Sequence, residues 1–120
     1  MSAKVLIIDD DPRNIFALNA TLKSKGYQCI TTTDARQGLH LVSDTPGISI
    51  VLIDMMMPEM DGYSAIPEIK KLRSQMPVIA VTAQAMQGDK EKCLAAGADD
   101  YISKPIDVDN LLGLLKKYAV

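Results

Sequence analysis

The chain is poor in the residues from which zinc sites and disulfide frameworks are built. Its 120 residues include no tryptophan, one phenylalanine, one histidine and two cysteines. Cys29, Cys93 and His40 do not have the number or the spacing of zinc ligands. We therefore expect a reduced protein in which neither a structural metal nor a disulfide is needed.

Long apolar runs and an excess of one charge are also absent. No stretch approaches the roughly 20 apolar residues that span a bilayer, and the run at residues 5–8 ends in three aspartates, unlike a secretory signal. Thirteen Lys and Arg oppose fifteen Asp and Glu, for a net charge of -2, and no basic run is present. These features predict a cytoplasmic protein that binds neither a membrane nor nucleic acid.

The size and composition fit one domain over residues 1–120. The chain has a mass of 13.0 kDa and a mean hydropathy of +0.07, and 48% of its residues are hydrophobic. A folded chain of this mass exposes roughly 6,300 Å² and buries about two-thirds of its unfolded surface. That is enough for one hydrophobic core.

Short aliphatic runs alternate with segments of helical spacing along the whole chain. Nearly continuous aliphatic runs are typical of strands buried on both faces of a parallel sheet, because helices then cover both faces. The pattern therefore predicts a doubly wound α/β fold with five strands. The predicted strands are residues 5–8, 28–32, 48–53, 78–81 and 101–102.

Several residues mark the ends of the predicted helices. Asp11 and Asp107 are placed as N-caps of the first and last helices, and Asp34 with Gln37 has the spacing of a capping box. Gly97 follows an apolar segment, as a residue just beyond a helix C-terminus does. The third helix, with apolar residues at 65, 69 and 72, also contains a proline at 67, which is tolerated only near the first turn.

Polar side chains follow four of the predicted strands. Asp9 and Asp10 come after the first strand, Asp54 after the third, Thr82 after the fourth and Lys104 after the fifth. The carboxyl ends of parallel strands meet at one edge of a sheet, which is where ligands bind in such folds. We therefore expect these five side chains to meet at one site.

The chemistry of that site follows from its charges. Several carboxylates a few ångströms apart require protons or a hard cation, and Mg²⁺ binds carboxylate oxygens and commonly bridges to phosphate. Lys104 supplies a positive charge and Thr82 a hydroxyl for phosphoryl oxygens. Asp54 is then the candidate nucleophile, which would form an aspartyl phosphate.

Each of these residues alone has an ordinary structural explanation, since Asp and Thr are common in turns and helix caps. Only their joint placement favours a site. The methionines at 55, 56, 57 and 60 are read as packing residues, and His40 as an isolated surface histidine.

Four motifs together resemble one family. They are VLIIDDDP at 5–12, VLIDMMMPEMDG at 51–62, AVTAQA at 80–85 and YISKPI at 101–106. In order and spacing these motifs resemble the response-regulator receiver domains of two-component signalling. The resemblance implies that residues 1–120 form a single receiver domain with a flavodoxin-like fold and strand order 2-1-3-4-5.

The resemblance also assigns roles within the site. It implies that Asp54 is the phosphoacceptor and that Asp10 ligates Mg²⁺ directly, together with Asp54 and the backbone carbonyl of Met56. Asp9 would act mainly through metal-bound water. Lys104 would be the lysine that contacts the phosphoryl group.

Further positions carry switch and structural roles by the same resemblance. Thr82 is the residue that moves toward the phosphoryl group, and Tyr101 is the aromatic residue that turns inward with it. Pro105 follows a peptide bond that is usually cis in the family. Pro58 and Gly62 match structural positions of the second motif.

The implied function is that of a phosphoacceptor in a two-component pathway or phosphorelay. A histidine kinase or a histidine phosphotransfer protein would donate the phosphoryl group from phosphohistidine, and the modified surface would bind a downstream protein. The domain would catalyse only its own phosphorylation and dephosphorylation, so it is not expected to be an enzyme with turnover. We expect output through protein contact and not through an attached effector segment. The TAQA and SKPI motifs are similar to those of hybrid-kinase receivers. A free-standing regulator and a kinase fragment both stay open.

Three other hypotheses compete with this one. A phosphohydrolase of the haloacid dehalogenase type would need a DxD pattern after the first strand, and usually a cap domain. A flavodoxin-like protein that binds FMN or a nucleotide would need a phosphate-binding loop there, where this chain has three acids. A receiver that works without phosphorylation is disfavoured because every catalytic position is filled. Met56 and Gln84 occupy variable positions of the family, so the lifetime of the phosphorylated state is left open.

Overall fold

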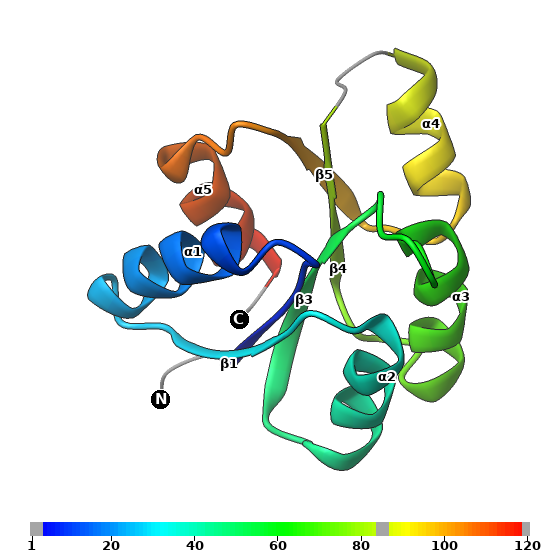
Figure 1. Ribbon diagram of the computed structural model, residues 1–120, viewed down its shortest axis with the longest axis horizontal. Coiled ribbons are helices and arrows are strands. Elements are labelled where there is room, and N and C mark those ends of the chain that lie inside the picture. Colours follow the sequence, from blue (N-terminus) through cyan, green and yellow to red (C-terminus); the bar gives the residue numbers. More distant parts are fainter. Residues whose placement is uncertain (1–3, 84–86, 119–120) are drawn as a thin grey trace.

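Five parallel strands alternate with five helices in the computed structural model, which describes residues 4–83 and 87–118 (Figure 1). Gln84 and the last residue of the AVTAQA motif lie outside the described residues. Every predicted strand lies within an observed one. The strands are β1 (Lys4–Ile8), β2 (Gln28–Thr32), β3 (Ile48–Asp54), β4 (Val78–Thr82) and β5 (Asp100–Ser103). The helices are α1 (Pro12–Ser24), α2 (Ala35–Asp44), α3 (Gly62–Leu72), α4 (Gln87–Ala95) and α5 (Val108–Tyr118).

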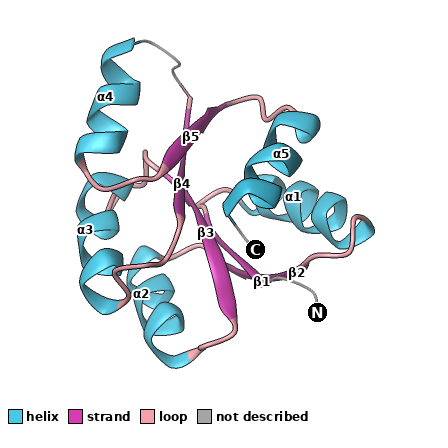
Figure 2. Ribbon diagram, turned by 180° about the vertical axis from the view of Figure 1, so that it is seen from behind, coloured by secondary structure: helices cyan, strands magenta, loops and turns pink. Residues whose placement is uncertain are grey.

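The strands form one sheet in the order β2-β1-β3-β4-β5, and every pair is parallel. Helices α1 and α5 lie on one face of this sheet, and α2, α3 and α4 lie on the other (Figures 1 and 2). The doubly wound fold and the strand order are therefore as predicted. All carboxyl ends of the strands lie along one edge.

Two apolar cores lie on the two faces of the sheet. In β1, Leu6 and Ile8 belong to the core under α2, α3 and α4, whereas Val5 and Ile7 belong to the core under α1 and α5. This alternation is the period of two that a strand requires. All four side chains are almost fully buried, and each such burial stabilises the fold by about 1.5–3 kcal/mol. Because both faces are covered, residues 5–8 of the strand are all aliphatic, and Lys4 stands at its less buried start.

Helix ends follow the predicted caps, with one difference. The carboxylates of Asp11, Asp34 and Asp107 each accept a backbone N–H two residues on, at 3.0, 2.9 and 3.1 Å. Gly97 has a φ of +115° just beyond α4, a conformation that favours glycine. The prediction that Gln37 forms a capping box with Asp34 at the start of α2 was wrong. Gln37 instead accepts the Thr32 hydroxyl at 2.6 Å, and that hydroxyl accepts the Asp34 N–H.

Helix α3 departs from the expectation for its proline. The helix begins at Gly62 after an Asp61 cap, so Pro67 lies in its second turn and not in its first. The helix tolerates this because Pro67 is exposed and the apolar face formed by Ala65, Ile66 and Ile69 is fully buried. Packing of that face outweighs the loss of one backbone hydrogen bond.

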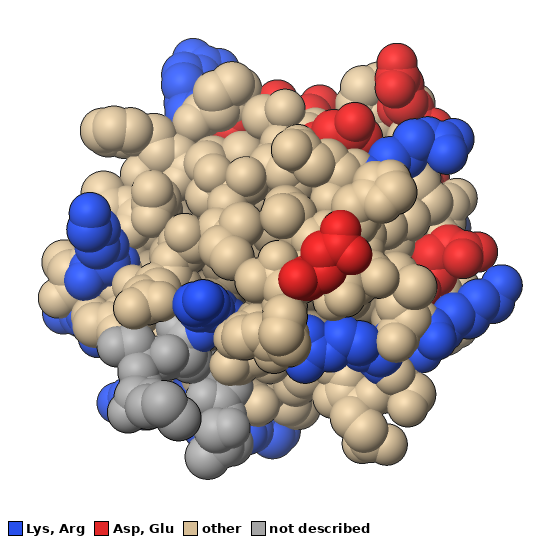
Figure 3. Space-filling model, turned by 90° about the horizontal axis from the view of Figure 1, so that it is seen from below, with Lys and Arg blue, Asp and Glu red and all other residues tan. Residues whose placement is uncertain are grey.

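The methionines differ in exposure, and the surface carries charges of both signs (Figure 3). Met55 and Met57 are buried as expected of packing residues, whereas Met56 is 70% exposed. On the face seen in Figure 3, side chains of both signs are scattered and neither gathers into a patch. Within residues 4–83 and 87–118, no helix combines the length and apolar character needed to cross a bilayer. The folded surface of 6611 Å² is close to the expected value.

Candidate functional site

The site lies where four strands end at the carboxyl edge of the sheet. Asp9 follows β1, Asp54 is the last residue of β3, Thr82 ends β4 and Lys104 follows β5. Backbone hydrogen bonds fix this edge, since the N–H of Lys104 donates to the Thr82 carbonyl at 2.8 Å. Parallel pairing therefore brings together residues that are far apart in the sequence.

Three carboxylates meet at this edge. Oxygen atoms of Asp9, Asp10 and Asp54 all lie within 4.8 Å of one another. Asp9 and Asp54 are only 3% and 4% exposed, whereas Asp10 is exposed to solvent. Two buried charges of one sign with a third at the rim are a donor set suited to a hard cation bound through oxygen. The predicted acidic cluster is present.

Lys104 is the cation that the protein itself supplies. Its Nζ donates to Asp54 Oδ2 at 3.2 Å and lies 3.7 Å from Asp9 Oδ2. Partial burial acts to lower the pKa of Lys104, but the negative charges of Asp54 and Asp9 outweigh it, and the net pKa is raised. Lys104 therefore keeps its proton and opposes the negative charges of Asp54 and Asp9.

Both carboxylate oxygens of Asp9 accept hydrogen bonds from the start of α1. Oδ1 accepts the Asp11 N–H at 2.9 Å, and Oδ2 accepts the Asn14 side-chain amide at 3.1 Å. Burial raises the pKa of Asp9 and the Asp54 charge adds to the effect, while these hydrogen bonds and Lys104 act to lower it. The sequence analysis missed Asn14. The sequence feature that could have indicated it is a side-chain amide in the first turn of a helix, five residues after the acid that follows the preceding strand.

The loop after β3 folds back on the Asp54 carboxylate. The N–H of Met56 donates to Asp54 Oδ1 at 3.0 Å, so the backbone of residue 56 lies at the site while its side chain faces solvent. Together with Lys104 at Oδ2, this bond fixes the orientation of the carboxylate. Metal ligation by the Met56 carbonyl stays a prediction.

The two switch residues lie on adjacent strands. Thr82 is 5% exposed at the end of β4, and Tyr101 on β5 is half-buried with Lys90 Nζ 5.4 Å from its ring centroid. A cavity of about 300 Å³ opens beside Thr82. Their switching roles stay predictions. The cavity is lined by Met56, Tyr63, Thr82, Ala83, Asp89 and Lys92.

The three structural residues flank the site. A Cβ at Gly62 would collide with Met55 Sδ and lie 2.9 Å from Met55 Cα, so this position needs glycine for its close approach. The peptide bond between Lys104 and Pro105 is cis, as the resemblance implied. Pro58 is exposed and lines a cavity with Asp10.

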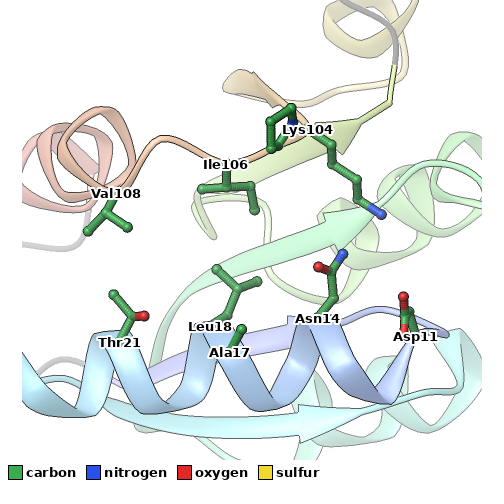
Figure 4. A pocket seen from close by; sticks show the side chains of 9 residues that line it. Asp11, Asn14, Ala17, Leu18, Thr21, Lys104, Ile106 and Val108 are labelled. Carbon is green, nitrogen blue, oxygen red and sulfur yellow. The ribbon is translucent and has the colours of Figure 1, made fainter.

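A groove of about 570 Å³ leads away from the site between α1 and the segment joining β5 to α5. Figure 4 shows Asn14, Asp11 and the Lys104 ammonium at one end and Thr21 and Val108 at the other. Polar groups thus lie at the end near the acidic cluster. The lining residues are Asp11, Asn14, Ala17, Leu18, Thr21, Lys104, Pro105, Ile106 and Val108.

Fold and site together define a class: a flavodoxin-like domain whose strand edge carries acids and a lysine in place of a glycine-rich phosphate loop. The model of the response regulator receiver domain family matches residues 5–116, so the chain belongs to that family. Family membership overturns the dehalogenase-type and FMN-binding alternatives.

Curated relatives include kinases much longer than this chain. The sensor histidine kinase RcsC of Salmonella typhi is 42% identical over 115 residues, which are 96% of this chain and 12% of that protein. The signal transduction histidine-protein kinase BarA of Escherichia coli K12 is 38% identical over 120 residues, 98% of this chain and 13% of that protein. The chain thus spans about an eighth of these relatives.

Solved structures agree with the fold. The receiver domain of sensor histidine kinase PA1611 from Pseudomonas aeruginosa PAO1, with a magnesium ion coordinated in its active site cleft, has a TM-score of 0.90 and 34% identity, and the match covers 99% of this chain and 98% of that one. A CheY-like receiver domain protein of Methanospirillum hungatei JF-1 has a TM-score of 0.89 and 31% identity, with 98% and 93% covered. Receiver domains of this family are phosphoacceptor switches in two-component signalling, not classical enzymes.

Proposed function

We propose that Asp54 accepts a phosphoryl group from a phosphohistidine of a histidine kinase or histidine phosphotransfer protein, in a reaction that requires Mg²⁺. The observation that carries this proposal is the position of the Asp54 carboxylate, buried beside two other acids and 3.2 Å from Lys104 Nζ. The kinase names of the relatives RcsC and BarA support a histidine donor.

The donor set fits Mg²⁺. Three carboxylates face one lysine, so negative charge is in excess at a partly buried site, and hard oxygen ligands suit this ion. Asp10, Asp54 and the Met56 carbonyl would hold the ion directly, and Asp9 would hold it through water. The bound ion would neutralise charge on the phosphoryl oxygens.

The residues of the chain then carry out the transfer. A carboxylate oxygen of Asp54 forms a bond to phosphorus as the bond from phosphorus to the donor imidazole nitrogen breaks, and that nitrogen keeps the electron pair. Lys104 and the Thr82 hydroxyl stabilise the charge on the phosphoryl oxygens. Attack of water on the acyl phosphate releases inorganic phosphate and resets the site. The domain thus acts on itself and has no separate substrate to turn over.

Phosphorylation would change a protein-binding surface. Movement of Thr82 toward the phosphoryl group would let Tyr101 turn inward, which alters the face formed by α4, β5 and α5 for a downstream protein. Residues 1–120 would act as a single receiver domain in the cytoplasm, alone or as part of a larger kinase.

Phosphorylation by a small donor tests this proposal. The chain is incubated with acetyl phosphate and Mg²⁺, and its intact mass is measured. One added phosphoryl group is expected, and none in Asp54→Asn or without Mg²⁺. Asp44→Asn is the matched control. Asp44 is the last residue of α2 and lies just before β3 begins, at the edge of the sheet opposite the carboxyl ends of the strands. This variant should be modified like the unsubstituted chain. A phosphoryl group that persists in Asp54→Asn would refute the assignment.

A further inference from the structure

Asn14 stands at the junction of the acidic cluster and the groove beside α1. It is the third residue of α1. In Figure 4 its amide nitrogen lies on the side of the Lys104 ammonium, while Leu18 and Ile106 occupy the apolar part of the groove. The residue is half-buried, so its amide lies at the rim of the site.

The Asn14 amide donates a hydrogen bond to one carboxylate oxygen of Asp9. Oδ1 of Asp9 accepts the Asp11 backbone N–H, which leaves Oδ2 for two donors: Asn14 Nδ2 at 3.1 Å and Lys104 Nζ at 3.7 Å. Lys104 lies closer to Asp54, at 3.2 Å. The neutral amide thus takes the near contact with Asp9, and the ammonium takes the near contact with the phosphoacceptor.

A neutral donor has a consequence that a charged one does not. An amide satisfies a buried carboxylate oxygen without cancelling its charge, so Asp9 stays hydrogen-bonded while the site keeps its attraction for a cation. Without this amide, Oδ2 of a 3% exposed carboxylate would lose its nearest donor, and Lys104 Nζ at 3.7 Å would be the cation left beside it. The ammonium would then move toward Asp9 and away from Asp54.

We propose that Asn14 is a positioning residue of the phosphoacceptor site: its amide holds Asp9 in place and thereby directs Lys104 to Asp54. This inference rests on the proposed function of Asp54. Asn14 touches no reacting atom. It acts through Asp9 and Lys104, and both metal affinity and the lysine environment depend on it.

Two variants separate this role from simple lining of the groove. Asn14→Ala removes the amide and opens the groove, whereas Asn14→Leu removes the amide and keeps most of the volume. Asn19→Ala is the matched control, because Asn19 lies on the same helix and does not line the groove. Thermal unfolding of each variant establishes that it is folded, and the Leu variant serves if the Ala variant is not.

Two measurements test the proposal. Titration with Mg²⁺ alone, followed by calorimetry, should give about tenfold weaker binding for both Asn14 variants, which is about 1.4 kcal/mol, and unchanged binding for Asn19→Ala. In the metal-free protein, the ¹⁵N resonance of the Lys104 ammonium should shift in both Asn14 variants and not in the control. Folded Asn14 variants with unchanged Mg²⁺ affinity and an unchanged lysine resonance would overturn the proposal, as would an effect of Asn14→Ala that Asn14→Leu lacks.

Failure of the proposed function has a different signature. An unsubstituted chain that binds no Mg²⁺ and takes no phosphoryl group would contradict the function of Asp54. The lysine resonance of the metal-free variants would still decide whether Asn14 controls the position of Lys104.

Discussion

Removal of one carboxylate from the acidic cluster should stabilise the metal-free protein. Two unit charges 4.8 Å apart repel by about 3.5 kcal/mol at an effective dielectric constant of about 20, and Asp10 repels two neighbours. Asp10 is exposed, and solvent and salt screen most of this repulsion. We therefore expect Asp10→Asn to raise the free energy of unfolding by about 1–2 kcal/mol.

This gain is large enough to measure. Unfolding of a chain of this length has an entropy of about 250 cal/mol/K, so 1–2 kcal/mol corresponds to about 4–8 °C in Tm. Because the chain has no tryptophan, far-UV circular dichroism or calorimetry in the presence of a chelator is the suitable assay. Glu91→Gln, which removes an exposed charge from α4, is the control and should leave Tm nearly unchanged.

Addition of Mg²⁺ should reverse the ranking of the two proteins. At a hundred times its Kd the ion stabilises the unsubstituted chain by about 2.7 kcal/mol, or about 11 °C, whereas Asp10→Asn should gain little at the same concentration. The electrostatic reasoning is refuted if Asp10→Asn melts no higher than Glu91→Gln in chelator, or if it keeps the full Mg²⁺ response.

Three further predictions concern single positions. Asp9 has a pKa raised by burial above 3.8, so its stabilising contribution is present below pH 3.8 and is lost as pH rises through the folded pKa; Asp9→Asn should therefore be more stable than the unsubstituted metal-free chain at neutral pH, with a difference that vanishes at low pH in urea titrations. Gly62→Ala should lower the free energy of unfolding by about 1–3 kcal/mol, because its Cβ collides with Met55, and an unchanged midpoint in urea would contradict this packing. Asp107→Ala should cost about 1 kcal/mol through loss of the α5 cap, and Asp107→Asn, which keeps the acceptor, should restore most of it.

The strands and their polar ends could be predicted because each signal is local. A parallel strand that is covered on both faces is aliphatic on both, as residues 5–8 of β1 are. The residue after such a strand lies at the carboxyl edge of the sheet, and this position does not depend on the conformation of the loops. Parallel order then brings Asp9 and Lys104 to one place without further information. The family motifs added roles that residue chemistry alone left open.

Features that depend on tertiary contacts were missed or wrong. Pro67 lies in the second turn of α3 because burial of the opposite face outweighs a local preference. Gln37 bonds to the Thr32 side chain of the preceding strand, which no spacing rule within a helix describes. Asn14 was missed because the role of a neutral amide depends on the carboxylate that it contacts, and that contact cannot be read from the sequence.

The dependence of the site on its last strand has a consequence during protein synthesis. Lys104 follows β5, and its backbone is held by Thr82 of β4. A nascent chain that has released Asp54 from the ribosome still lacks this lysine and the pairing that positions it. The site therefore forms only when nearly the whole domain has been translated, and a prematurely terminated chain would carry Asp54 without the lysine that contacts it.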